Sequence, residues 1–137
     1  MVASYRELTV WRKAMELVVA VYSVTSQLPR DERFGLADQL RRAVVSIPSN
    51  IAEGHARQSQ REFAHFLSVA LGSLAEVDTQ LDLATRLELL DATVVDDIIE
   101  SIDHLRAMLL KLLKSIRNRV AGVSDGEPPD YLIEESP

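Results

Sequence analysis

The chain has 137 residues, a net charge of −6 and no cysteine, and 47% of its residues are hydrophobic although only 5% are aromatic. These totals indicate one domain with an aliphatic, all-helical core, and they exclude disulfides and thiolate metal sites, which suits a reducing cytoplasm. Because the N-terminal stretch has charges where a signal peptide needs its apolar run, and Leu17 to Val24 is too short to span a bilayer, we expect a cytoplasmic location and no membrane partner.

The first predicted helix spans residues 7–28 and carries two apolar stripes. One consists of Leu8, Trp11, Met15, Val18 and Tyr22, and the other of Val10, Ala14, Leu17, Val21, Val24 and Leu28. A surface helix of a monomer needs only one such stripe. We therefore expect one stripe to face the core of the domain and the other to contribute to a contact between subunits.

The second predicted helix spans residues 31–57, with Asp31 as its N-cap. Its apolar stripe continues across Pro48, which predicts a kinked helix rather than two helices. A polar stripe lies opposite and consists of Arg42, Ser46, Asn50, Glu53 and Arg57. This stripe is either a small polar site or part of the packing. We favour packing, with Asn50 fixing the register, Ser46 or Ser49 satisfying a carbonyl freed by Pro48, and Gly54 allowing close approach of another helix or beginning the helix end.

The third and fourth predicted helices span residues 60–89 and 92–119. Ser59 and Glu62 form a capping box at the start of the third helix, Asp91 is the candidate cap of the fourth, and both helices carry heptad stripes. The pair Gly72-Ser73 suggests close packing. Short connections predict an antiparallel up-down-up-down four-helix bundle over residues 1–121. Residues 122–137 contain five acids and no base, and we expect them to be a disordered tail.

Charge is distributed unevenly over this predicted bundle. Residues 1–19, 50–66 and 106–121 would share one end and have a net charge of +6, whereas residues 20–49 and 67–105 have a net charge of −7. One explanation is that late bases complement the macrodipole of the last helix. The other is that the basic end contacts phosphate or an acidic partner, with the acidic tail as a competitor. The candidate contact residues are Arg57, Arg61, Lys111, Lys114, Arg117 and Arg119.

The sequence contains little that predicts chemistry. Glu62-x-x-His65 matches half of a di-iron carboxylate pattern, but the second Glu-x-x-His motif of that pattern is missing from the chain. The chain also lacks a glycine-rich phosphate loop and a nucleophile elbow. We therefore predict no catalytic residue, no metal ligand and no cofactor.

Several stretches resemble the four-helix bundle protein family first described as 23S rRNA intervening-sequence proteins. They are Leu8-x-x-Trp11-x-x-Ala14, Leu28-Pro29, Phe34-Gly35-Leu36, Gln39-Leu40-Arg41-Arg42-Ala43, the run from Ser46 to Gly54, and Gly72-Ser73-Leu74-Ala75-Glu76. The resemblance covers residues 5–119 and leaves out the acidic tail. Its motif residues, which we interpret as structural or interface residues, are Arg41, Arg42, Ser46, Pro48, Asn50, Glu53 and Gly54.

The resemblance implies a bundle that assembles as a homopentameric ring and whose biochemical role is largely unassigned. The accessory proteins of diversity-generating retroelements are distantly similar, and they bind a reverse transcriptase and nucleic acid through a strongly basic surface. This chain differs in being acidic overall. We expect a non-enzymatic, homo-oligomeric scaffold or accessory protein. One alternative is an accessory factor that binds RNA, DNA or a nucleic-acid-processing protein through the basic end; another is an enzyme with a site not visible in sequence.

Overall fold

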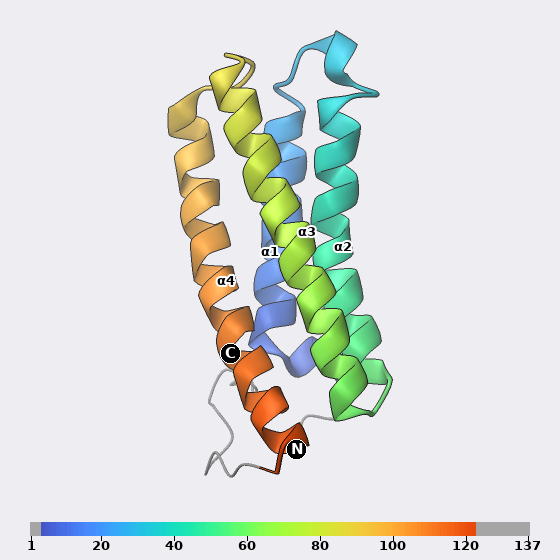
Figure 1. Cartoon of the computed structure of the whole chain (residues 1–137). Coiled ribbons are helices and arrows are strands. Elements are labelled where there is room, and N and C mark those ends of the chain that lie inside the picture. The colour runs from blue at the N-terminus through green and yellow to red at the C-terminus, as the bar shows by residue number, and fades with distance from the viewer. Residues whose placement is uncertain (1–3, 123–137) are drawn as a thin grey trace.

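The computed structural model describes residues 4–122, which form four long helices and no strand (Figure 1). The helices are α1 (Thr9–Thr25), α2 (Leu36–Ala56), α3 (Gln60–Arg86) and α4 (Ala92–Val120), with short 3-10 helices at Tyr5–Glu7 and Arg30–Glu32. Among the described helices none has the combination of length and hydropathy that crossing a bilayer requires. The predicted disordered tail lies outside the described residues, apart from Gly122 at its start.

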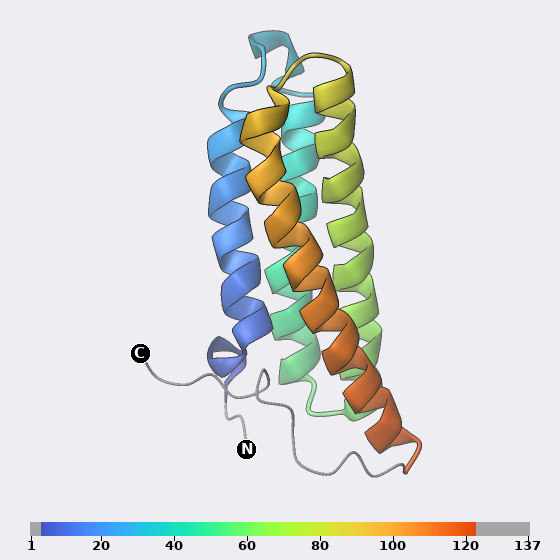
Figure 2. The ribbon, with the colours of Figure 1, turned by 90° about the vertical axis from the view of Figure 1, so that its left-hand side faces the viewer.

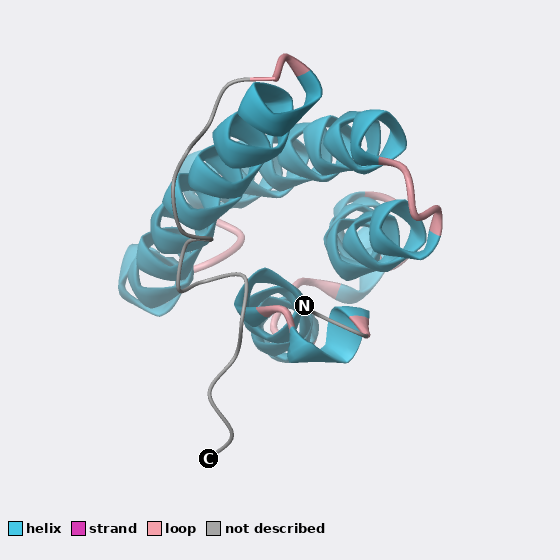
Figure 3. Ribbon diagram, turned by 90° about the horizontal axis from the view of Figure 1, so that it is seen from below, coloured by secondary structure: helices cyan, strands magenta, loops and turns pink. Residues whose placement is uncertain are grey.

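The four helices form an antiparallel bundle in which the connections alternate between its two ends (Figures 1 and 2). Helices α1 and α3 each pack against both α2 and α4, so the four helices surround a common centre (Figure 3). The C-terminal end of α4 lies on the α3 side of the bundle, away from the start of α1 (Figures 2 and 3). This arrangement confirms the predicted helical bundle within residues 4–122 and decides which basic residues lie together.

The core is built from the predicted heptad stripes. In α1 the second stripe faces inward, and each of its residues is at most 9% exposed. The stripes of α3 and α4 are likewise buried, from Phe63 to Ala84 and from Ile98 to Ile116. Because these residues recur at alternating steps of three and four, all of them point to one side of a helix, and burial of that side stabilises the bundle.

Two of the three predicted cap residues are confirmed, although the Glu62 carboxylate, which the capping box would direct back to Ser59, lies 3.8 Å from the Arg57 guanidinium. The Ser59 hydroxyl accepts a hydrogen bond from the Glu62 N–H at 3.4 Å, and an Asp91 carboxylate oxygen accepts one from the Thr93 N–H at 3.0 Å. The same Asp91 oxygen accepts from the Thr93 hydroxyl. These hydrogen bonds, first from the Thr93 backbone and then from its side chain, hold the pKa of Asp91 below its ordinary value, because they favour the ionised form.

The third predicted cap is wrong, because α2 begins at Leu36 rather than near Asp31. Asp31 lies in the 3-10 helix Arg30–Glu32, and the chain leaves helical geometry at Gly35, which has φ −103° and ψ −110°. A Glu32 carboxylate oxygen lies within 3.4 Å of the Leu36 N–H and accepts its hydrogen bond. The turn at Gly35 thus separates Asp31 from the helix that it was predicted to cap.

Helices α1 and α3 are also shorter than predicted, and the local backbone conformation explains where α1 begins and where α3 ends. Leu8 is extended, with φ −77° and ψ 125°, so α1 begins at Thr9 rather than at residue 7. At the end of α3, Glu88 adopts a left-handed φ of 60°, and the Leu89 N–H bonds to the Ala84 carbonyl at 2.8 Å. This is a Schellman motif, which ends the helix at Arg86 instead of residue 89.

The Asp91 cap predicts a pH-dependent contribution to stability. Since folding lowers the pKa of Asp91, its contribution is complete above the ordinary aspartate pKa and is lost as the pH falls through the lowered value. Asp91→Ala is therefore expected to reduce the free energy of unfolding at neutral pH and to have a smaller effect once the pH has fallen through the lowered pKa of Asp91. Urea unfolding across this range, with Asp97→Ala as the control on an exposed acid of the same helix, tests the prediction. A pH-independent difference would contradict it.

Candidate functional site

The motif residues at the start of α2 connect this helix to α1. The Arg41 Nε–H donates to the Thr25 hydroxyl at 2.9 Å, and the Arg41 guanidinium lies over the Tyr22 ring, 4.8 Å from its centre. Arg42 is exposed and pairs with Asp38 one turn earlier, at 2.9 Å. Arg41 is therefore a packing residue that orients Tyr22, whereas Arg42 contributes a surface ion pair.

The middle of the motif connects α2 to α3. Ser46 and Ser73 share a hydrogen bond of 2.8 Å between their hydroxyls, and the Asn50 side-chain amide donates to both the hydroxyl and the carbonyl of Ser46. Pro48 lies buried inside a continuous α2, and the Ser49 hydroxyl donates to the Val45 carbonyl at 2.8 Å. Asn50 thus orients the serine that bridges the helices. The prediction that Ser46 or Ser49 satisfies the carbonyl freed by Pro48, that of Val44, is therefore wrong, because Ser49 bonds to the neighbouring carbonyl and Ser46 bonds to Ser73 and Asn50.

Gly54 lies where α2 and α3 approach each other closely. A Cβ atom at this position would lie 2.6 Å from the Cβ of Phe66 and 3.1 Å from Cδ1 of Phe63. This confirms the predicted close approach at Gly54. The same prediction for Gly72 is wrong, since a Cβ there would meet no described atom within 4 Å, and it is the neighbouring Ser73 that faces α2.

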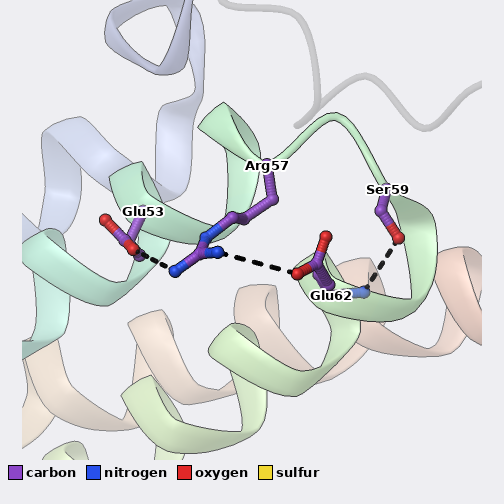
Figure 4. A network of polar contacts seen from close by, with 4 residues as sticks. All are labelled: Glu53, Arg57, Ser59 and Glu62. Carbon is purple, nitrogen blue, oxygen red and sulfur yellow. Dashed lines mark hydrogen bonds and ion pairs between the residues drawn. The ribbon is translucent and has the colours of Figure 1, made fainter.

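Arg57 lies at the corner between α2 and α3 inside a network of contacts (Figure 4). Its guanidinium is 2.7 Å from Glu53 and 3.8 Å from Glu62, and it lies 5.4 Å from the centre of the Phe66 ring. Ser59 caps α3 beside this network. Two carboxylates therefore balance the charge of Arg57, and the residue fixes the α2–α3 turn.

The other five predicted contact residues differ from Arg57 in having no described carboxylate within ion-pair distance. All five are exposed, and we call them the basic face: Arg61, Lys111, Lys114, Arg117 and Arg119. Arg117 Nη2 donates to the Ser68 hydroxyl of α3 at 3.3 Å. For the four bases of α4 the lack of local ion pairs follows from sequence, because residues 104–121 contain no acid.

The bases of α1 do not join the basic face. The end of α4 lies beside α3 and away from the start of α1, where Arg6, Arg12 and Lys13 are found (Figures 2 and 3). The Arg6 guanidinium lies 5.5 Å from the centre of the Trp11 ring, and Lys13 pairs with Glu16 at 3.4 Å. The sequence therefore predicted the basic end of the bundle but not its division into two separate parts.

The outer side of α1 is an apolar surface. Met15 and Tyr22 are each 42% exposed, Val19 is 71% exposed, and Trp11 and Val18 are half-buried. We call these five residues the α1 outer face. The prediction is wrong for Leu8, which belongs to the same predicted stripe but is only 1% exposed. Val19 belongs to neither predicted stripe, but its spacing of four from Met15 and three from Tyr22 places it on the same side of the helix.

Two of the three histidines lie against aromatic rings. His55 and His65 pack edge-on against Phe63 and Phe66, and no group of three or more histidines and acids within residues 4–122 could hold a metal ion. An acidic depression between α3 and α4 lies far from the basic face, and two of its carboxylates already pair with arginines. Its lining residues are Asp78, Thr79, Asp82, Thr85, Val95, Asp96 and Ile99.

The family model described as 23S rRNA-intervening sequence protein matches residues 6–111. The chain belongs to this family. The match contains all seven motif residues together with Arg57, Arg61 and Lys111 of the predicted contact residues, whereas the last three bases of α4 follow it. No curated protein matches the chain.

A solved structure adds the fold to this sequence evidence. The chain is similar to a protein of unknown function from the S23 ribosomal protein family of Bacteroides thetaiotaomicron, known from a crystal structure. The two share 25% sequence identity and superpose with a TM-score of 0.71, over 77% of this chain and 98% of the other. The family and its bundle fold are thus shown, while the neighbour's description assigns no role.

Proposed function

We propose that this family member is a non-enzymatic scaffold or accessory protein that assembles with itself through the α1 outer face. The exposure of this face carries the proposal. Its aromatic, methionine and valine side chains form a continuous apolar strip on a helix whose opposite side already fills the bundle core. Contiguous apolar patches on proteins commonly mark contacts with other molecules.

A closed ring would give this assembly a defined number of subunits. In cyclic assembly each subunit uses two different patches, so the α1 outer face of one subunit meets another surface of the next. The family resemblance implies five subunits. Light scattering is then expected to give about 77 kDa, five times the 15.3 kDa chain, and a monomer would overturn the proposal.

The basic face supports a second candidate function, the binding of nucleic acid. Its five cations are exposed and lack described carboxylate partners, as phosphate contacts require. A net charge of −6 disfavours nonspecific attraction of nucleic acid to the chain as a whole. Any binding of nucleic acid would therefore depend on the basic face. The partner would be RNA, DNA or a protein that carries them.

Charge reversal on α4 tests this second function. Arg117→Glu with Arg119→Glu is expected to weaken binding of single-stranded RNA at least about tenfold at low salt, because two phosphate contacts become repulsive. Fluorescence anisotropy against salt concentration measures the affinity and its salt dependence. The matched control is Arg30→Glu with Arg33→Glu, which makes the same charge change on exposed residues at the other end. Equal losses in both variants would refute a role for the basic face.

A further inference from the structure

The basic face differs from the other charged surfaces of the bundle in how its charge is balanced. Several bases elsewhere pair with acids one turn away, as in Arg42 with Asp38, Arg86 with Asp82 and Lys13 with Glu16. Arg106 likewise pairs with Asp103, at 2.8 Å. After Arg106, α4 contains four more bases and no acid, so none of these four has an acid later in the helix to pair with, and all four belong to the basic face.

Acids that could balance the bases of α4 follow directly after this helix in the chain. Residues 123–137 contain Asp125, Glu127, Asp130, Glu134 and Glu135 and no base. This segment begins where α4 ends, beside the basic face, and Gly122 with φ 78° ends the helix there. Five negative charges thus follow a surface of five unbalanced positive charges, an arrangement typical of charge complementarity.

The length and the apolar residues of the acidic segment 123–137 also fit the basic face. From Lys111 to Arg119 the helix rises about 12 Å, whereas fifteen residues can span about 50 Å when extended. The segment is therefore long enough to reach all four bases that α4 contributes to the basic face. Leu110 is 51% exposed beside Lys111, and the segment contains the apolar run Tyr131-Leu132-Ile133 between acids, which suits a surface where bases surround an apolar side chain.

We propose that the acidic segment 123–137 binds the basic face of its own bundle and competes there with phosphate. Direct connection to α4 favours this contact, because a short tether gives an effective concentration on the order of millimolar. The contact between the acidic segment and the basic face requires no other molecule. The competition rests on the second proposed function, since it requires that nucleic acid use the same surface.

The lysine content of the chain makes the contact easy to detect. Its three lysines are Lys13, Lys111 and Lys114, and no lysine or arginine follows Arg119. Trypsin therefore releases residues 120–137 as one peptide that carries all five acids. A zero-length carbodiimide reagent joins carboxylates to lysine amines in contact, and the Lys13–Glu16 pair, 3.4 Å apart, is an internal reference for the reaction.

On the full chain at low salt, we expect peptide 120–137 to be joined to Lys111 and Lys114 within one subunit. About 0.5 M NaCl should reduce this yield at least about fivefold relative to the Lys13–Glu16 product, because salt screens exposed charges. Cross-linking of the peptide to Lys13 as often as to either other lysine, or none at all while Lys13–Glu16 forms, would overturn the proposal. Products that migrate as dimers would show that the segment binds a neighbouring subunit instead.

Competition is measured separately on two full-length variants. One replaces the five acids of residues 123–137 by their amides, and the other does the same to five exposed acids of the opposite end, Glu76, Glu88, Asp96, Asp97 and Glu100. Only the first is expected to bind oligouridylate at least about tenfold more tightly than the wild type. Equal affinities would refute competition. If no variant binds RNA while the cross-link forms, the nucleic-acid function fails and the contact within the chain stands.

Discussion

Replacing Met15 and Val19 by glutamate is expected to convert the assembled protein into folded monomers of 15.3 kDa. Both side chains project outward from α1, so the bundle loses no core contact, and substitutions at such exposed sites usually change stability by less than about 0.5 kcal/mol. In an interface the same change removes about 1.5–3 kcal/mol of apolar burial per side chain and adds a charge without a partner. Light scattering gives the mass, and circular dichroism confirms that the bundle remains helical.

Two leucines elsewhere provide the matched control for this prediction. Leu83 and Leu87 are 44% and 61% exposed near the end of α3, and they are as apolar as the residues of the α1 outer face. Leu83→Glu with Leu87→Glu adds the same charge but is expected to leave the mass unchanged. The opposite result would be dissociation of the Leu83→Glu, Leu87→Glu variant while the variant with glutamate at Met15 and Val19 stays assembled. It would place the contact between subunits on α3 and refute the use of the α1 outer face.

The helices and their buried sides were predictable from sequence because local periodicity determines them. Heptad spacing in α3 and α4 places every third or fourth residue on one side, and those residues are the ones that the structure buries. Ser59 and Asp91 were identifiable because a cap depends on residues two or three positions away. Asp31 was misleading because the turn at Gly35 depends on φ and ψ values that composition does not determine.

Contacts between helices were less predictable. The Glu53–Arg57 pair is an i,i+4 contact and followed from spacing, but the approach of Glu62 and Phe66 to the same guanidinium depends on how the α2–α3 turn folds. Likewise, Ser73 and Gly72 are neighbours in sequence, yet only Ser73 faces Ser46. The candidate functional residues were therefore found as a set of bases, whereas the structure was needed to separate Arg57 from the exposed basic face.

These contacts divide the chain into packing and candidate binding surfaces. The family motif of α2 connects the bundle internally, through Arg41 to α1 and through Ser46 and Gly54 to α3. Exposed apolar and basic side chains instead gather on other helices, on the outer side of α1 and the last turns of α4. The motif thus explains why the chain adopts the family fold, and the proposed functions use surfaces outside it.

Gly54→Ala is expected to lower the free energy of unfolding by about 1–3 kcal/mol, because the added methyl group must displace α3 from its close contact with α2 at this position. The clash is with Cβ of Phe66, which is fixed to the backbone and cannot move away by changing rotamer. The loss occurs although alanine favours a helix over glycine by about 1 kcal/mol. Urea unfolding at matched protein concentration measures the difference.

The control is the same substitution at the other helical glycine, Gly72. It is exposed in the middle of α3, with no described atom within 4 Å of an added Cβ, so Gly72→Ala should raise the free energy of unfolding by up to about 1 kcal/mol through helix propensity alone. If Gly54→Ala lowers the free energy of unfolding and Gly72→Ala raises it, close packing rather than backbone entropy determines the need for glycine at position 54. Stabilisation by both substitutions would mean that α2 and α3 can separate at Gly54 without cost.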